Sequence, residues 1–210
     1  MSSAHIRTAH GILIFGQGHP VIRSLRKNTQ GPTLHGTQIW QSSYAIMEYL
    51  EDHPLPPGTR IMEIGCGWGA LGTFCAKRFG ADVLLTDADS NVFPYADAHG
   101  QLNGVQMRTE RQQFEHISAA RLSEQQLILG GDICFWPDLA RQLQRLIQRA
   151  LANGVQQILL ADPGRKTFMQ LADHCQDWYG AELLPWRLGK KTKAKGHLLV
   201  IHNHLLARPA

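Results

Sequence analysis

A glycine-rich turn carries the clearest chemical signal in the sequence. Gly65, Gly67 and Gly69 follow a short apolar run, and apolar residues at helical spacing begin directly after them. Glycines permit a sharp turn and a close approach of the backbone to a ligand, because no Cβ atom intervenes. The first turn of the following helix offers free N–H groups, which suit a carboxylate. This segment is therefore predicted to hold a ligand with its backbone.

Two acids flank the turn. Glu63 precedes it, and Asp87 ends the next strand-like run. A carboxylate there can accept hydrogen bonds from two ribose hydroxyls. The G-x-G-x-G spacing differs from the G-x-G-x-x-G of nicotinamide dinucleotide sites, and no lysine stands where a phosphate-binding loop needs one. A ligand with an amino-acid end and a nucleoside end fits better. The alternative is an ordinary turn followed by a surface acid.

Strand-like and helix-like runs alternate from Gly58 onward and must position these residues. Such alternation predicts an α/β fold with a mostly parallel sheet, helices on both faces and a ligand at the carboxyl ends of the strands. The last two strands lack a helix between them and should pair antiparallel. Strands are expected at 60–64, 81–86, 105–109, 126–130, 155–161, 182–188 and 197–206, and helices near 71–79, 91–103, 137–151 and 166–178.

Three segments resemble motifs of a known family. Glu63-Ile-Gly-Cys-Gly-Trp-Gly69 resembles motif I of the class I, seven-strand methyltransferases, which use S-adenosylmethionine (SAM). Thr86-Asp87 is similar to their second motif, and Gly131-Asp132 to the motif beside the transferred methyl group. The resemblance covers roughly residues 36 to 206. It implies a seven-strand Rossmann-like methyltransferase fold with an antiparallel last strand, SAM as cofactor and S-adenosyl-L-homocysteine as product.

A narrower resemblance points to the small protein-lysine methyltransferases of family 16. The segments that carry it are Gly36-Thr-Gln-Ile-Trp-Gln-Ser-Ser, Asn103-Gly-Val and Asp132-Ile-Cys-Phe135. Asp162-Pro-Gly-Arg165 resembles the electron-transfer-flavoprotein beta-subunit lysine methyltransferase branch, and equally the predicted nicotinamide N-methylases. The family's D-x-x-Y stands here as D-x-x-F, so a tyrosine hydroxyl has no role at that position.

The resemblance also implies a set of cofactor-binding residues. Trp40 would pack against the methionine end of SAM and Asp87 would hold the ribose. Phe114 is the candidate cover for the adenine, where the family often has a tryptophan. Trp40 has a second interpretation, since with Tyr44 and Met47 it forms a helical apolar stripe typical of a core. The complete predicted set is Trp40, Glu63, Gly65, Cys66, Gly67, Gly69, Asp87, Phe114 and Gly131.

Three residues after the fourth strand are candidates for the methyl-acceptor side. Asp132 is predicted to orient an incoming nitrogen, and Phe135 and Trp136 to form an aromatic wall. A buried aromatic channel lowers the pKa of a lysine amine and so favours its neutral, nucleophilic form. An aromatic face also attracts cationic groups. The alternatives are a helix-start acid for Asp132 and core packing for the two aromatic residues.

Basic residues near the last strands have open interpretations. Arg165 could bind an acidic group of a substrate or contact Asp162. The run from Arg187 to Lys195, which holds Lys190, Lys191 and Lys193, is a solvated loop tip or a surface that steers an acidic partner. Nucleic acid is the less favoured partner, because Asp132-Ile-Cys-Phe135 lacks the paired prolines of nucleic-acid amino-methyltransferases.

Composition bounds the remaining possibilities. The chain of 210 residues suits one domain, which we divide into an N-terminal arm at 1–36 and a methyltransferase domain at 37–210. The 4 cysteines form no CxxC pair, and the 11 histidines show no convincing metal-ligand spacing. No membrane span or signal peptide is evident, so a cytoplasmic location is expected. The predicted function is SAM-dependent N-methylation of a protein lysine. The alternatives are a small-amine or heteroaromatic methyltransferase, a non-catalytic SAM-binding partner protein and, least favoured, an oxidoreductase.

Overall fold

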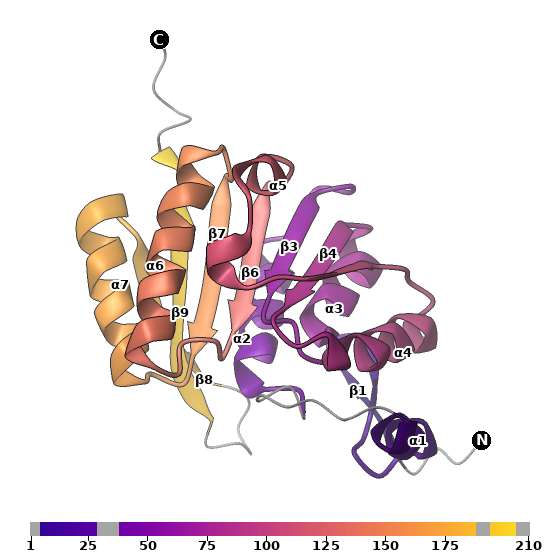
Figure 1. Cartoon of the computed structure of the whole chain (residues 1–210). Coiled ribbons are helices and arrows are strands. Elements are labelled where there is room, and N and C mark those ends of the chain that lie inside the picture. Colours follow the sequence, from indigo (N-terminus) through magenta and orange to yellow (C-terminus); the bar gives the residue numbers. More distant parts are fainter. Residues whose placement is uncertain (1–4, 29–37, 188–193, 205–210) are drawn as a thin grey trace.

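The apolar runs of the sequence form the strands of one central sheet (Figure 1). The structure is a computed structural model that describes residues 5–28, 38–187 and 194–204. The strands of this sheet are β3 (Arg60–Ile64), β4 (Asp82–Asp87), β5 (Arg108–Arg111), β6 (Leu127–Gly131), β7 (Gln157–Asp162), β8 (Glu182–Arg187) and β9 (Lys195–His202). The helices around it are α2 (Gln41–Asp52), α3 (Ala70–Phe79), α4 (Phe93–Asn103), α5 (Ala119–Ser123), α6 (Pro137–Ala152) and α7 (Lys166–Tyr179).

The sheet has the order β5-β4-β3-β6-β7-β9-β8. All neighbours from β5 to β7 are parallel, whereas β9 runs antiparallel to both β7 and β8. The predicted mostly parallel sheet with an antiparallel last strand is therefore confirmed. β9 follows β8 in the chain but lies between β7 and β8. The strand order reverses between β3 and β6, and a ligand site is expected beside such a switch point.

Helices cover both faces of the sheet. In Figure 1, α6 and α7 lie in front of it, and α2 and α3 lie behind. Most buried side chains form two layers accordingly, and a third, smaller cluster consists of Phe15, Ile22, Trp68 and Tyr95. One layer joins α2 and α3 to one face, and the other joins α5, α6 and α7 to the opposite face. In the described chain, no helix is both long and apolar enough to cross a membrane.

The strand that follows α4 in the chain begins later than the sequence predicted. The expected run 105–109 is replaced by β5 at Arg108–Arg111. Gly104 and Val105 are used instead to close α4, because their N–H groups bond to Gln101 O and Gly100 O. β5 lies at the edge of the sheet and is wholly polar, so no apolar alternation marks it.

The N-terminal region contains a hairpin and a helix. β1 (Ile6–Ala9) pairs with β2 (Ile12–Phe15), and α1 (Pro20–Asn28) follows. Gly16-Gln-Gly-His19 forms the turn between β2 and α1. The amide of Asn103 on α4 binds both Leu13 N and Leu13 O at 2.8 Å, which docks the hairpin on α4.

Candidate active site

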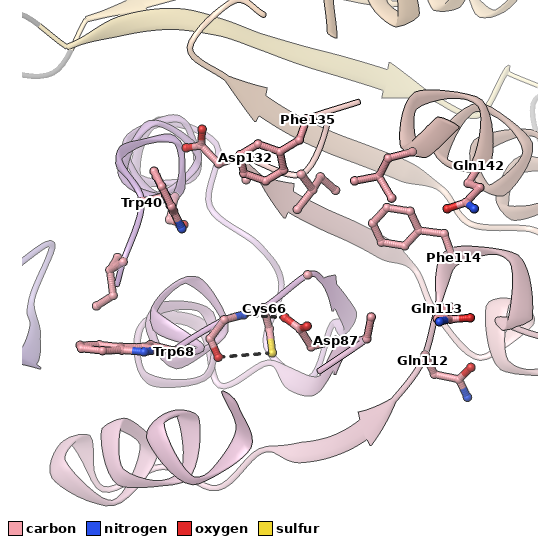
Figure 2. A pocket seen from close by; sticks show the side chains of 18 of the residues that line it. Trp40, Cys66, Trp68, Asp87, Gln112, Gln113, Phe114, Asp132, Phe135 and Gln142 are labelled. Atoms are coloured by element: carbon pink, nitrogen blue, oxygen red, sulfur yellow. Dashed lines mark hydrogen bonds between the residues drawn. The ribbon is translucent and has the colours of Figure 1, made fainter. Parts of the chain in front are cut away.

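A cavity of about 300 Å³ opens at the carboxyl ends of β3, β4 and β6 (Figure 2). Figure 2 shows Trp40, Asp132 and Phe135 on one side, Cys66 and Asp87 opposite, and Phe114 with Gln113 toward one end. The volume suits a ligand of small-molecule size. Of the predicted site residues, ten line this cavity: Trp40, Gly65, Cys66, Gly67, Asp87, Phe114, Gly131, Asp132, Phe135 and Trp136. The other three, Glu63, Gly69 and Arg165, are not part of the lining.

The glycine loop, residues 65–69, has a conformation that other residues adopt with difficulty. Gly65, Gly67 and Gly69 have φ angles of 62°, 51° and 65°. A Cβ at Gly65 would lie 2.6 Å from the side chain of Ile133. The loop therefore needs glycine both for its backbone angles and for its contact with the β6–α6 segment. Gly65 and Gly67 contribute only backbone groups to the cavity lining.

Glu63 supports this loop from beneath. Its carboxylate accepts a hydrogen bond from Gly72 N at 2.7 Å, in the first turn of α3, and the residue is only 3% exposed. Burial raises the pKa of Glu63 to about 8, the Gly72 N–H bond opposes that shift, and the charge of Asp87 adds to it. Its observed contact is thus with the protein backbone. A direct contact with the cofactor stays a prediction.

Asp87 fixes the other edge of the loop. One carboxylate oxygen accepts from Gly67 N and the other from Asp89 N, both at 3.0 Å. Burial raises the pKa of Asp87, and these N–H bonds oppose the shift. Each carboxylate oxygen has further lone pairs, so the group can accept hydroxyl donors from a ligand as well.

The start of α2 closes the cavity beside β6. Trp40 is the N-cap residue of α2, and its ring meets that of Phe135 edge to face, with centroids 6.3 Å apart. A Cβ at Gly131 would lie 3.1 Å from Ser43 N, so glycine allows this helix start to approach the end of β6. We call Phe135 and Trp136 the aromatic wall, and Trp40 stands beside it. The core interpretation fails for Trp136, which is 51% exposed.

Asp132 does not act as a helix-start acid, because Trp136 is the N-cap residue of α6. Its carboxylate accepts from Ser42 N at 3.3 Å and from Arg165 Nη1 at 2.8 Å. Its backbone has φ of 58°, in the left-handed region that non-glycine residues seldom adopt. Strained backbone of this kind is concentrated at functional sites.

Arg165 lies behind the aromatic wall. The predicted contact with Asp162 is confirmed, because the Arg165 guanidinium donates to the Asp162 carboxylate at 2.6 Å. It also stands over the Phe135 ring, 4.3 Å from the centroid. Burial acts to lower the pKa of Arg165, but the bonds to Asp132 and Asp162 outweigh it and raise that pKa. A contact with an acidic substrate group stays a prediction.

The end of the cavity near Phe114 is held by α6. Arg149 donates to the backbone oxygens of Ile117 and Phe114, and Gln142 donates to Glu115 at 3.1 Å. The short segment that presents Phe114 is thereby fixed to the helix. This arrangement can present an aromatic face to a flat ring.

Sequence reasoning missed several lining residues, including Ser43, Trp68, Ile133, Leu139 and Gln142. Helical spacing could have found some of them. Ser43 lies one turn after Trp40, and Gln142 lies one turn after Leu139. Trp68 stacks on Tyr95 of α4, with centroids 5.3 Å apart, and no sequence-local pattern signals that contact.

Residues 23–173 match a family model described as lysine methyltransferase. That span is most of the chain. The chain belongs to this lysine methyltransferase family. Membership implies SAM as the methyl donor, and the glycine loop with Asp87 beside it fits such a ligand.

Curated relatives agree with the family assignment. The electron transfer flavoprotein beta subunit lysine methyltransferase of Xenopus laevis is 27% identical over 61% of this chain and 52% of its own length. The ribosomal protein L11 methyltransferase of Prochlorococcus marinus (strain MIT 9303) is 35% identical over 60% of this chain and 40% of its own length. The chain therefore spans about half the length, or less, of these relatives.

A solved structure supports the fold. The ribosomal protein L11 methylase of Lactobacillus delbrueckii subsp. bulgaricus has a TM-score of 0.59 at 17% identity, covering 80% of this chain and 81% of that one. The family's Rossmann-like methyltransferase fold, predicted from the motifs, is confirmed.

Proposed function

We propose that this protein is a SAM-dependent N-methyltransferase whose acceptor is a lysine side chain of another protein. One observation carries the proposal: a single cavity has the glycine loop and Asp87 on one side and Asp132 with the aromatic wall on the other. A donor held by the first side would present its methyl group toward the second. Methyl transfer requires this in-line arrangement of donor and nucleophile.

The donor side divides among the residues already described. The glycine loop and the first turn of α3 would bind the carboxylate of SAM, Asp87 its ribose, and Trp40 its methionine portion. Phe114 would cover the adenine. When bound, SAM supplies a methyl group activated by a sulfonium. The protein's part is to orient that group and exclude water from it.

On the acceptor side, the nitrogen must be neutral, because its lone pair forms the new N–C bond as the C–S bond breaks. The aromatic wall would desolvate a lysine amine and so lower its pKa. Asp132 would accept a hydrogen bond from the amine and orient it. The proton that the nitrogen gives up is released to solvent.

The names of the relatives favour a protein acceptor. Two groups of them are methyltransferases for an electron transfer flavoprotein beta subunit and for ribosomal protein L11. A small amine or heteroaromatic acceptor is the second candidate, since an aromatic wall also suits such a molecule. A non-catalytic SAM-binding protein is the third.

Labelled SAM tests these candidates directly. The purified protein would be incubated with methyl-labelled SAM and a lysate of its source cells, and the products separated by size with and without nuclease. We expect label in a nuclease-resistant protein band, and peptide mapping should then find it on lysine. Label confined to small molecules would replace the lysine proposal with the second candidate.

Asp132→Asn is the matched variant, because asparagine tolerates the left-handed backbone of this position. Labelling should fall about tenfold or more while SAM affinity persists, since a charge-assisted hydrogen bond is lost. An unchanged rate would remove Asp132 from the mechanism. SAM binding with no label in any fraction, from lysates of starved and growing cells alike, would support the non-catalytic candidate.

A further inference from the structure

A cluster of three charged groups lies directly behind the aromatic wall. Arg165 Nη1 donates to Asp132 at 2.8 Å and to Asp162 at 2.6 Å. The side chains of Asp132 and Asp162 are 4% and 0% exposed, and that of Arg165 is 26% exposed. Two carboxylates share one guanidinium, so the cluster carries one net negative charge. Asp132 is the member of the cluster that also lines the cavity.

The backbone is shaped to bring these groups together. Asp162 ends β7, and its second oxygen accepts from Gly164 N at 2.9 Å and Arg165 N at 2.8 Å, which turns the chain back. Asp132 N donates to Ala161 O at 2.9 Å, so the ends of β6 and β7 are joined at this point. With the left-handed backbone of Asp132, these bonds aim its carboxylate at Arg165. The cluster is thus a built feature and not a chance surface pair.

Few other titratable groups of the described chain face the cluster. Cys134 lies in the same segment as Asp132, and burial raises the pKa of its thiol to about 11. His197 of β9 is the register partner of Asp162. Lys166 follows Arg165 and is exposed. Across the cavity stand Asp87 and, beneath the loop, Glu63. Arg165 is the group that pairs with both carboxylates.

We propose that Arg165 is a positioning residue with two effects: it keeps Asp132 from stabilising the protonated form of the acceptor amine, and it holds the Phe135 ring in the aromatic wall. This inference rests on the proposed function, because it concerns an acceptor nitrogen that must lose a proton. An unpaired carboxylate beside an amine favours the ammonium form and so raises the pKa of that amine. The shared guanidinium limits this effect while Asp132 keeps a lone pair free to orient the nitrogen.

The test compares Arg165→Gln with Arg165→Lys. Initial rates of label transfer from SAM would be measured between pH 6 and pH 10, with whichever lysate fraction the wild-type protein labels as acceptor. Arg165→Gln should lose about tenfold or more at pH 7 and should recover at high pH only to a lowered plateau, because it also lacks the guanidinium over Phe135. On the acidic side of the profile, each tenfold fall in rate corresponds to an acceptor amine whose pKa is one unit higher. In Arg165→Lys, the rise of the rate on the acidic side of the pH profile should return to its wild-type position. The maximum rate at high pH should stay below that of wild type, since an ammonium lacks the planar face over Phe135.

Two further measurements separate this inference from simpler explanations. Affinity for S-adenosyl-L-homocysteine and the melting temperature report whether each variant is folded with an intact donor side. Arg141→Gln is the matched control, because Arg141 is an exposed arginine of α6 paired only locally with Asp138 among the described residues. It should behave as wild type.

The outcomes are distinct. If wild-type protein labels no acceptor, the proposed function fails first. If wild type is active and Arg165→Gln lowers the rate equally at every pH, Arg165 has only a structural role. A pH profile of Arg165→Gln that matches the wild-type profile in both height and position would overturn the inference altogether.

Discussion

The two sides of the cavity are built in different ways. The donor side is made mainly of backbone, in which three glycines with left-handed φ angles form a loop. Asp87 accepts from Gly67 N of this loop, and Glu63 accepts from Gly72 N in the first turn of α3. The acceptor side is made of side chains, in which Asp132, Asp162 and Arg165 form an ion cluster behind aromatic rings. The two sides meet where Ile133 packs on Gly65.

The two ways of building suit two tasks, which are the binding of a shared cofactor and the binding of one particular substrate. A backbone loop can hold one ligand type while the side chains opposite are exchanged, so the donor side suits a shared cofactor. The acceptor side has to suit one substrate, and its chemistry depends on the charges and rings of particular side chains. Substitutions on the two sides should therefore change different kinetic constants.

The largest effect should follow from Asp87→Ala on the donor side. It removes the acceptor of Gly67 N and the predicted ribose contact together, so affinity for S-adenosyl-L-homocysteine should fall about ten- to a hundredfold. Calorimetric titration measures this directly. Asp82→Ala is the control, because Asp82 lies exposed at the opposite end of β4 and should leave affinity unchanged. Affinity within twofold of wild type for Asp87→Ala would refute the predicted role of Asp87.

Glu63→Gln should test the raised pKa of the buried acid on the donor side. The folded-state pKa of Glu63, about 8, lies above its ordinary value of 4.5. The folded protein therefore keeps a proton that the unfolded chain loses across this window. The free energy of unfolding should fall as pH rises from 4.5 to about 8, by up to roughly 1.4 kcal/mol per pH unit from this group.

Glutamine cannot ionise but can still accept from Gly72 N. Glu63→Gln should therefore lack this decline, and its stability relative to wild type should increase with pH. Urea unfolding at pH 5, 6.5, 8 and 9 would measure both proteins. Glu48→Gln is the control at an exposed position of α2, and its free energy of unfolding should change with pH as that of wild type does. Parallel curves for wild type and Glu63→Gln would show that Glu63 titrates normally.

The smallest effect is expected from Trp136→Ala on the acceptor side. Trp136 is half exposed at the cavity, so its loss should raise the KM for the acceptor about two- to fivefold, as for an exposed cation–π contact. Affinity for the cofactor product should not change. Trp178→Ala on α7 is the matched control, because Trp178 is 74% exposed and is not part of the cavity lining. If Trp136→Ala lowered the affinity for the cofactor product and left the KM for the acceptor unchanged, the assignment of the two sides would be reversed.

The same contrast explains what the sequence could reveal. The donor side is local in sequence, because its glycines and acids stand at a fixed spacing along two neighbouring strands. Four of the residues predicted there, Gly65, Cys66, Gly67 and Asp87, line the same cavity. The ion cluster joins Asp132 to Arg165 across 33 positions and to Ser42 across 90. No local pattern encodes such contacts, so Arg165 was recognised as a candidate but its contact with Asp132 was not foreseen.

The N-terminal hairpin was missed for another reason. Its turn consists of His10 and Gly11, whose φ angles are 47° and 75°. Hairpin turns of this kind usually show Asn-Gly or Asp-Gly, and histidine in the first position gives a weaker signal. The Asn103 side chain on α4 binds the backbone of β2, a contact that only the folded arrangement reveals.

The place of β9 between β7 and β8 has a consequence for the newly made chain. During synthesis, β7 leaves the ribosome well before Lys195–His202, so the edge that β9 will occupy has no partner for the time needed to add more than thirty residues. β7 is almost wholly buried in the finished protein, and a bare apolar strand edge is a site for aggregation. We expect the growing chain to depend on chaperones until β9 emerges, while β3, β4 and β6 can already pair.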